Sequence, residues 1–157
     1  IQAALRLTEY LLRQAGVRSE AELPSDPVMT VYDSRQIEQV LINLLENAHR
    51  YTPPGTAIEI SAETIHEAAG TDETALTANI PNAVIVHVAD HGAGIPNELL
   101  DQIFDRFFRL PPNQSLHGSG LGLTICRGMI QAHGGRIWAE NRQDGSGAIF
   151  SFMLPLV

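Results

Sequence analysis

An amphipathic stretch over 34–51 is the feature that most constrains how this chain can fold. Its apolar residues recur every three or four positions, as on one face of an α-helix: Ile37, Val40, Leu41, Leu44, Leu45 and Ala48. Asp33, followed three residues later by Gln36, resembles a capping box at the start of this helix, and Pro53-Pro54-Gly55 ends it. The sequence therefore predicts a helix that packs one face against a hydrophobic core.

The segments around this helix predict strands and further helices. Strands are indicated over 17–23, 28–32, 56–63, 83–89, 136–141 and 148–154, and helices over 1–16, 97–104 and 120–133. The small and polar residues of 66–82 indicate a long, flexible connection within a hairpin. Helices mixed with mostly antiparallel strands predict an α+β fold, a two-layer α/β sandwich with the helices on one face of the sheet. The 157 residues fit a single domain over 1–157.

Charge and composition exclude several classes of protein. The net charge of −8 argues against binding to nucleic acid or an anionic membrane. All ten basic residues are arginine, whereas Walker-type phosphate loops and eukaryotic-type protein kinases need a lysine on the phosphates. The single cysteine, Cys126, lies in an apolar helical stretch, which favours a buried, inert thiol in a reducing cytoplasm. Because Ile1 opens within a helix-like pattern, we expect a piece of a longer protein.

Polar residues at helical spacing form a second face on the 34–51 helix. Asn43, Asn47 and Arg50 share this face with Gln36. Asparagine is a poor residue inside a helix, so two on one face need a reason. Two interpretations stay open at this point: a solvated face, or an oxygen ligand for Mg²⁺ beside an arginine that meets phosphate.

A carboxylate and two glycines follow the predicted strand 83–89, in the order Asp90-His-Gly92-Ala-Gly94. The glycines allow the backbone to turn sharply and to approach a flat ligand closely. Asp90 could accept a hydrogen bond from the exocyclic amine of adenine, and it would reject guanine, which carries an oxygen there. A plain turn is the alternative for this motif taken alone.

Glycines also open the predicted helix 120–133, as Gly118-Ser-Gly-Leu-Gly122. Free backbone amides and the positive end of a helix could hold a phosphate there, and an ordinary flexible loop is the alternative. The preceding segment, Phe104-Asp-Arg-Phe-Phe-Arg109, could pin one end of a mobile loop and direct Arg106 and Arg109 toward phosphate or a protein partner. Core phenylalanines with solvated arginines are the alternative for this segment.

Two other kinds of chemistry find no support in the sequence. His87 and His91 are four apart, but they lie on a predicted strand and its following turn, and no cysteine or histidine stands at zinc spacing. A hydrolase of the Gly-x-Ser-x-Gly type has no nucleophile here. We therefore expect neither a metal cluster nor a serine hydrolase.

The order of the motifs is more specific than any one of them. Asn-x-x-x-Asn-Ala-x-Arg-Tyr, Asp-x-Gly-x-Gly, Phe-x-Arg-Phe-Phe-Arg and Gly-x-Gly-Leu-Gly-Leu together resemble the nucleotide-binding signature of sensor histidine kinases. That family shares a superfamily, and its Bergerat-type ATP-binding fold, with gyrase, MutL and the heat-shock chaperone ATPases. The resemblance runs from about residue 1 to the end, and segments 125–135 and 139–142 look most like KdpD-type, potassium-responsive kinases.

This resemblance implies ATP and Mg²⁺ as cofactors and a role for each matching residue. Asn47 would coordinate Mg²⁺, Asp90 would read adenine, and a lid over about 106–119 would close on the nucleotide. Asn43, Asn47 and Arg50 would form the catalytic group. The nucleotide-binding set would be Asn43, Asn47, Arg50, Tyr51, Asp90, Gly92, Gly94, Ile95, Phe104, Arg106, Arg109, Gly118, Ser119, Gly120, Leu121, Gly122 and Leu123.

A difference from gyrase-like ATPases narrows the expected activity. Those enzymes place a water-activating glutamate four residues before the magnesium asparagine, and Asn43, which takes no proton from water, stands there in this chain. Glu46 is rotated by about 100° from Asn47 on the helix. We therefore expect the chain to hold ATP without fast hydrolysis and to donate its γ-phosphate to a histidine.

The resemblance also implies partners. The accepting histidine would lie in a separate dimerisation domain of the same kinase, because no histidine of this chain has the required sequence context, so the chain alone should not phosphorylate itself. A response regulator would act downstream, and the domain would be cytoplasmic without touching the membrane that anchors its parent kinase. The alternatives are a gyrase- or MutL-like ATPase, a non-catalytic nucleotide-binding interaction module, and an anti-sigma serine kinase.

Overall fold

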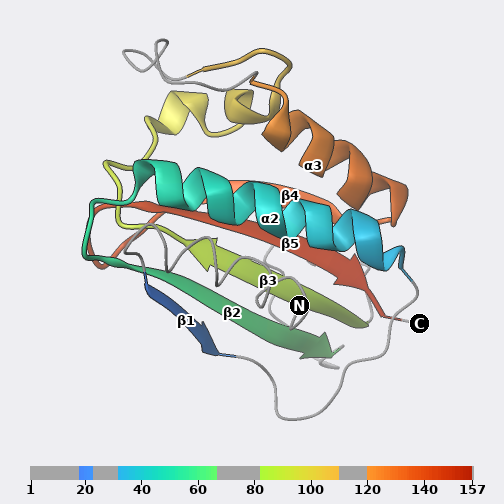
Figure 1. Cartoon of the computed structure of the whole chain (residues 1–157). Helices are drawn as coiled ribbons and strands as arrows, with labels where there is room; N and C mark the ends of the chain where they lie inside the picture. The colour runs from blue at the N-terminus through green and yellow to red at the C-terminus, as the bar shows by residue number, and fades with distance from the viewer. Residues whose placement is uncertain (1–17, 23–31, 67–81, 110–119, 157) are drawn as a thin grey trace.

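The elements of the chain form two layers, as the sequence predicts (Figure 1). The computed structural model describes residues 18–22, 32–66, 82–109 and 120–156. One layer is a sheet made of β1 (Arg18–Glu22), β2 (Ala57–His66), β3 (Asn82–Ala89), β4 (Arg136–Asn141) and β5 (Ala148–Pro155). The other layer contains α2 (Ser34–Tyr51), α3 (Gly122–Ala132) and the 3-10 turns η1 (Asn97–Leu99) and η2 (Gln102–Phe104).

The sheet is mostly antiparallel, with the strand order β1-β2-β3-β5-β4. Among the described strands, only β1 runs parallel to its neighbour, β2. The predicted central strand is confirmed, because β3 lies between β2 and β5. At the end of β3, Ala89 pairs with Glu59 of β2 and with Ile149 of β5. Asp90 therefore leaves the sheet beside the start of β2 and the turn that joins β4 to β5.

The hydrophobic core lies between the sheet and the two helices. All the apolar residues predicted on one face of α2 are buried, and Val40, Leu44 and Ala48 are fully so. Alternate residues of β3 point into this core, since a strand shows successive side chains to opposite faces: Val84, Val86 and Val88. A smaller cluster of Ala83, Ile85 and Met153 lies on the other face of the sheet. The helix predicted first is thus the element on which the core is built.

Helix α2 begins at the predicted cap but not with a complete capping box. The Asp33 carboxylate accepts hydrogen bonds from the backbone N–H groups of Arg35 and Gln36, at 2.9 and 3.4 Å. The Gln36 side chain reaches the Asp33 carboxylate and not the Asp33 backbone. That N–H instead donates to Nε2 of His133, at 3.0 Å, beyond the end of α3. A contact with a residue far along the chain, His133, thus takes the place of the contact with Gln36 that a complete capping box would have.

The prediction of one helix over 97–104 is wrong in the type of helix, because the segment forms the two short 3-10 turns η1 and η2. The backbone bonds there span three residues, as from Leu99 N–H to the Pro96 carbonyl. In an α-helix the Glu98 carbonyl would accept from the backbone of Gln102, but here it accepts from the Gln102 side-chain amide, at 3.1 Å. The side chain thus takes the place of the backbone donor, and the turn stays tight.

The remaining strand predictions hold where the structure describes the chain. Strand β1 falls within the predicted 17–23, and β2 extends three residues beyond the predicted 56–63, to His66. Strands β2 and β3 pair antiparallel, as expected of the two arms of a hairpin. The helix predicted over 1–16, most of the strand predicted over 28–32 and most of the connection predicted over 66–82 lie outside the described residues.

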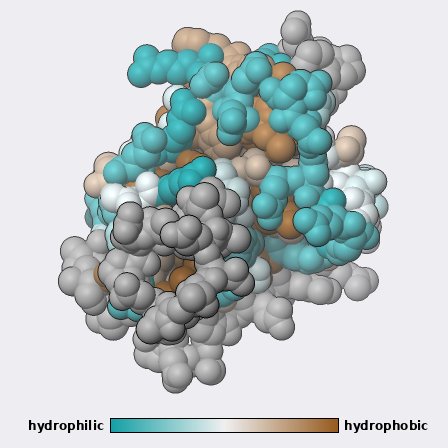
Figure 2. Space-filling view, turned by 180° about the vertical axis from the view of Figure 1, so that it is seen from behind, coloured by the Kyte–Doolittle hydropathy of each residue, from teal (hydrophilic) through white to brown (hydrophobic). Residues whose placement is uncertain are grey.

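On the face seen from behind, polar residues cover much of the described surface (Figure 2). Seen from behind, apolar atoms gather near the top of the molecule, the level at which α3 and the 3-10 turns lie in Figure 1 (Figure 2). Phe107 and Ile125 are large apolar side chains exposed in this part of the chain, at 70% and 44%. No helix among the described residues is long and apolar enough to cross a membrane.

Candidate functional site

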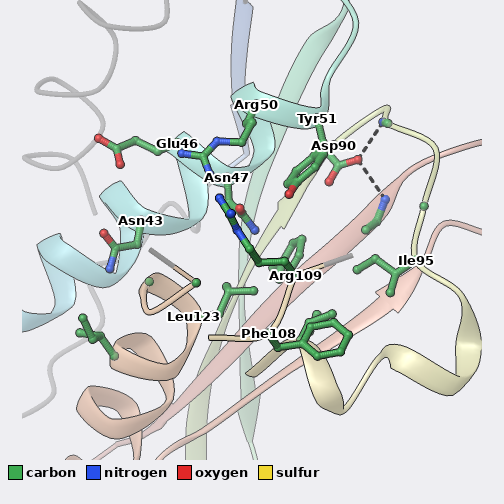
Figure 3. Close-up of a pocket in the computed structure, with 18 of the residues that line it drawn as sticks. Asn43, Glu46, Asn47, Arg50, Tyr51, Asp90, Ile95, Phe108, Arg109 and Leu123 are labelled. Carbon is green, nitrogen blue, oxygen red and sulfur yellow. Dashed lines mark hydrogen bonds between the residues drawn. The ribbon is translucent and has the colours of Figure 1, made fainter. Parts of the chain in front are cut away.

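A cavity of about 860 Å³ opens between α2, α3 and one end of the sheet (Figure 3). A volume of this size suits a ligand as large as a nucleotide. Its walls come from α2, the segment after β3, the start of α3 and the first residues of β5. The predicted site residues that line it are Asn43, Asn47, Arg50, Tyr51, Asp90, Gly92, Gly94, Ile95, Arg109, Gly120, Gly122 and Leu123.

One end of the cavity is marked by the buried carboxylate of Asp90, which is only 3% exposed. Its Oδ1 accepts hydrogen bonds from the backbone N–H groups of Gly92, at 2.8 Å, and Ala148, at 3.1 Å (Figure 3). Both hydrogen bonds use this one oxygen. Oδ2 has no hydrogen-bond partner among the described residues, which leaves it to meet a donor in the cavity. Burial raises the pKa of Asp90, against the smaller opposing effect of the two backbone N–H groups.

An ion-pair cluster holds the backbone around Asp90 from outside the cavity. Arg142, after β4, binds the carboxylate of Glu59 on β2, at 3.2 Å, and that of Asp144, at 2.8 Å. The hydrogen bond from Arg142 lowers the pKa of Asp144, and the same contact is the main cause of the raised pKa of Arg142. His91 also contacts Glu59, and its Nδ1 lies 2.9 Å from the Ala57 carbonyl oxygen. The turn after β3 is thereby tied to β2 and to the β4–β5 hairpin.

The polar face of α2 lines the rest of the cavity, and its two asparagines differ. The Asn43 amide is occupied: its Oδ1 accepts from Gln39, at 2.9 Å, and its Nδ2 donates to the Cys126 sulfur, at 3.5 Å. The Asn47 amide has no hydrogen-bond partner among the described residues. Asn47 therefore has a free amide oxygen to offer a ligand, whereas Asn43 is held by two neighbours.

Glu46 also lines the cavity, which the sequence reasoning had not included. Glu46 is rotated by about 100° from Asn47 around the axis of α2, as expected. The α2 residues that line the cavity span at least that angle, so the rotation does not take Glu46 off the cavity. Gln39, Asn43 and Arg50 lie between Glu46 and Asn47 on the helical wheel. Glu46 therefore stands at one edge of this polar face and not behind it.

The two sides of the predicted lid meet at Phe107 and Gly120. The Phe107 N–H donates to the Gly120 carbonyl, at 3.1 Å. Gly120 has a φ of +69°, and a Cβ there would lie 2.9 Å from the Phe107 Cα, so a side chain would disturb this junction. Phe107 itself has a φ of 62°, a strained value for a residue with a side chain. The residues between, 110–119, lie outside the described part of the chain.

The structure separates the predicted phenylalanine–arginine segment into residues of different environment. Phe104 is buried in the core, as the alternative interpretation expected, while Phe107 is exposed and Phe108 lines the cavity. Arg109 lines the cavity as well, and its side chain extends toward the polar face of α2 in Figure 3. Arg106 is exposed and does not line the cavity.

Five members of the predicted nucleotide-binding set are not placed on the cavity. Phe104, Arg106 and Leu121 lie elsewhere in the described structure, and Gly118 and Ser119 fall outside the described residues. Leu121 precedes α3 with its neighbours Gly120 and Gly122 both on the cavity, so the motif lines the wall with alternate residues. The glycine motif thus contributes part of its length to the cavity.

Sequence reasoning missed part of the cavity lining, and helical spacing could have found some of it. Gln39 lies one turn before Asn43 on α2. On α3, Ile125 follows Gly122 at a spacing of three, and Met129 follows Ile125 at a spacing of four. Ala93, Pro96 and Phe108 adjoin, along the chain, predicted site residues that line the cavity. The fold alone brings the remaining lining residues to the cavity: Ile103, Ala148 and Phe150.

The cysteine is buried, as the sequence predicts. Cys126 is fully buried, and burial raises the pKa of its thiol to about 11, so it stays protonated at neutral pH. His87 lies 2.7 Å from the Ser151 hydroxyl and 3.4 Å from Glu63. Among the described residues no group of histidine, cysteine, aspartate or glutamate could hold a metal ion.

Taken together, the cavity can bind a planar base at one end and a polyanion at the other. Asp90 offers an acceptor within an apolar setting that includes Ile95 and Phe150. At the other end stand the Asn47 amide, the guanidinium of Arg50 and the start of α3, where backbone N–H groups have no helical partner. This division matches the two chemical halves of a nucleoside polyphosphate.

Comparison with known proteins identifies the family of this chain. Residues 32–157 match the family described as histidine kinase-, DNA gyrase B- and HSP90-like ATPases. The chain is 36% identical to the sensor protein KdpD of Clostridium acetobutylicum over 99% of its own length, and 36% identical to the sensory kinase SasA of Synechococcus elongatus over 86%. It spans 17% of that KdpD and 31% of that SasA. The KdpD match supports the predicted resemblance.

Solved structures agree with the sequence matches. The catalytic domain of histidine kinase ThkA is 33% identical, with a TM-score of 0.77 over 99% of this chain and 89% of that one. ThkA in complex with the response regulator protein TrrA is 32% identical, with a TM-score of 0.74 over 99% of this chain and 39% of that one. This chain therefore belongs to the histidine kinase-, DNA gyrase B- and HSP90-like ATPase family, as a histidine kinase catalytic domain.

Proposed function

We propose that this chain binds ATP with Mg²⁺ and donates the γ-phosphate to a histidine on a separate dimerisation domain of the same kinase. The observation that carries the proposal is the pairing, in one cavity, of the buried Asp90 carboxylate with the free amide of Asn47. The parent protein would act as a sensor kinase, and a response regulator would receive the phosphate, as the ThkA–TrrA complex suggests by analogy.

Asp90 would select the base. Its Oδ1 is fixed by two backbone N–H groups, so Oδ2 is directed to accept from the exocyclic amine of adenine. Guanine presents an oxygen at that position, and two acceptors facing each other in a buried site repel. The site should therefore prefer ATP to GTP.

The phosphates would lie along α2 and the start of α3. Asn47 would hold Mg²⁺ through its amide oxygen, and the ion would neutralise charge on the phosphate oxygens. Arg50 and Arg109 would contact phosphate, with Tyr51 at the edge of the nucleotide. Asn43 would line this wall as a fixed side chain, because its amide is already bonded. The lid over about 106–119 would close from the Phe107–Gly120 junction.

Transfer would need little chemistry from the chain beyond positioning and charge stabilisation. The bond between the γ-phosphorus and the oxygen shared with the β-phosphate breaks as a bond to the imidazole nitrogen forms. ADP leaves, and the imidazole proton passes to a base or to water. The chain would supply the arginines and amides that fix the phosphates in line with the incoming histidine.

The decisive experiment mixes the purified chain with candidate helical-hairpin domains, Mg²⁺ and ATP labelled on its γ-phosphate. We expect acid-labile, base-stable phosphate on the hairpin domain and none on the chain alone. Asn47→Ala should abolish most of this transfer and weaken Mg²⁺-dependent ATP binding by at least about tenfold. His49→Ala, an exposed change on the same helix away from the cavity, should leave both unchanged.

An ATP-hydrolysing enzyme is the second candidate, and the position of Glu46 on the cavity favours it. A carboxylate there could accept a proton from water, as the gyrase-like glutamate does one turn earlier. Steady hydrolysis by the chain alone at about 1 per second, lost in Glu46→Gln, would establish this alternative.

A further inference from the structure

The side chain of Asn141, the last residue of β4, replaces a missing backbone pairing beside the base end of the cavity. Its Oδ1 accepts from the Ile95 N–H, at 2.8 Å, and its Nδ2 donates to the Ile95 carbonyl, at 2.7 Å. The same Nδ2 lies 3.0 Å from Oδ1 of Asn97. One amide therefore pairs with both backbone groups of a single residue, as a neighbouring strand would.

The segment that Asn141 holds has few other anchors. Residues 91–95 connect the end of β3 to the first 3-10 turn, and in the described structure their backbone forms no hydrogen bond to another backbone group. Two side chains bind its backbone: Asp90 binds the Gly92 N–H, and Asn141 binds both backbone groups of Ile95. The His91 side chain, which contacts Ala57 and Glu59, ties only the first residue of the segment to β2. Each anchor stands at one end of the segment.

The packing around Gly94 shows that this contact is close. Gly94 has a φ of +78°, and a Cβ on it would lie 2.9 Å from the Asn141 Oδ1. The neighbouring residue Ile95 is only 7% exposed and forms part of the cavity wall. Asn141 itself does not line the cavity. Any effect it has on a ligand must pass through the residues it contacts: Gly94 and Ile95 in the cavity wall, or Asn97 in the first 3-10 turn.

We propose that Asn141 is a positioning residue for base recognition: it fixes Gly94 and Ile95 so that this wall fits the adenine bound by Asp90. The inference rests on the proposed function, because it concerns the base end of the same site. It differs from the roles of Asp90 and Asn47 in that Asn141 acts through the backbone of other residues.

Three variants test the inference in the isolated chain. Asn141→Ala removes both bonds to Ile95, and Asn141→Asp keeps the volume and the acceptor but sets a carboxylate oxygen against the Ile95 carbonyl. Asn97→Ala is the matched control, because it removes only the third contact of the same amide. Each variant is first checked for a cooperative thermal transition, and binding is measured where all variants are folded.

Two readouts separate positioning from a general loss of structure. Amide exchange of Ile95 in the free chain should become at least about tenfold faster in both Asn141 variants, since a broken hydrogen bond exposes that N–H. ATP affinity should fall by up to about tenfold, because binding would then also have to order a wall that Asn141 otherwise fixes in advance. The affinity for inorganic tripolyphosphate, measured by competition, should stay within about twofold of the wild-type value, because tripolyphosphate has no base to contact this wall.

The possible outcomes are distinct. Unchanged ATP affinity in both Asn141 variants would overturn this inference while leaving the proposed function intact. A parallel loss of ATP and tripolyphosphate binding would also overturn it, since the defect would then not be specific to the base. If Asn97→Ala equals Asn141→Ala, the effect runs through the 3-10 turn and not through Ile95. Failure of the wild-type chain to bind ATP would overturn the proposed function, and this inference with it.

Discussion

At the scale of single residues, the cavity shows that identical side chains at helical spacing take different parts. Asn43 and Asn47 lie one turn apart on α2 and both line the cavity. Asn43 is bonded to Gln39 and Cys126, so moving its amide to a ligand would first break two contacts. Asn47 has no such contact with a described residue, which suits the Mg²⁺-binding role proposed for it.

Asp90 allows recognition to be separated from folding. Asp90→Asn keeps an oxygen for the N–H groups of Gly92 and Ala148 and places an NH₂ group where Oδ2 stood. That group would repel the exocyclic amine of adenine and could donate to the guanine oxygen. We expect ATP affinity to fall by about 100-fold and the preference for ATP over GTP to shrink or reverse. Calorimetry with both nucleotides measures this, and an unchanged preference would contradict the assignment of Asp90.

The same substitution has a pH-dependent effect on stability. Burial raises the pKa of Asp90, so the folded chain binds this proton more tightly than the unfolded chain does. The stability contributed by Asp90 is therefore present below the ordinary pKa of 3.8 and is lost as the pH rises through the raised folded value. At pH 7 we expect Asp90→Asn to be at least as stable as the wild type, and this advantage should vanish near pH 3. Urea unfolding at both pH values measures the difference.

At the scale of elements, one histidine joins the start of α2 to the end of α3. His133 accepts from the Asp33 N–H through Nε2, at 3.0 Å, and its Nδ1 lies 2.7 Å from the Met129 carbonyl. Both bonds form only if the proton of the neutral ring is on Nδ1. The two helices that flank the cavity are thereby linked at the ends where α2 starts and α3 stops.

Removing this link should destabilise the helix pair without touching the cavity. We expect His133→Ala to lower the free energy of unfolding by about 1–2 kcal/mol, since two hydrogen bonds are lost and the Asp33 N–H must turn to water. Gln131→Ala, an exposed change on the same helix, serves as the control. Chemical denaturation of the two variants gives the comparison, and equal stabilities would show that the His133 contacts contribute nothing.

At the scale of the whole molecule, the chain holds a nucleotide site but, as proposed, no acceptor for the phosphate. The cavity is formed by the helices and one end of the sheet. Under the proposed function, the accepting histidine would come from outside the chain. Slow hydrolysis would then be needed, because ATP bound between encounters would otherwise be consumed.

The role of Glu46 decides between the two proposed activities. If the chain is a kinase domain, its hydrolysis of ATP should stay far below about 1 per second, and Glu46→Gln should change that rate by less than about twofold. A coupled assay for ADP measures both proteins. Because Glu46 both lines the cavity and is exposed at the edge of the polar face, the effect of Glu46→Gln on this rate separates the two activities.

The helices and strands that could be predicted are those that form because of the residue pattern within their own segment. The apolar stripe of α2 is buried as the spacing indicated, and β3, β4 and β5 lie where alternation and turn residues placed them. Prediction was wrong over 97–104, where one side chain, Gln102, takes the bond that would have continued a helix. Periodicity reports which face of a segment is apolar, and it does not report such a competition.

For the site, the sequence by itself determined the chemistry: a carboxylate after the central strand, amides on a helix, and glycines at the start of another. The types of these residues and their order along the chain are enough to predict that chemistry, because each can be placed on its own helix, strand or turn from the neighbouring sequence. Only the tertiary structure decided which of them share a cavity, that Phe104 is core, and that Asn43 is already bonded. Asn141 shows the reason most plainly, because its partner Ile95 lies 46 residues away and only the pairing of strands brings the two together.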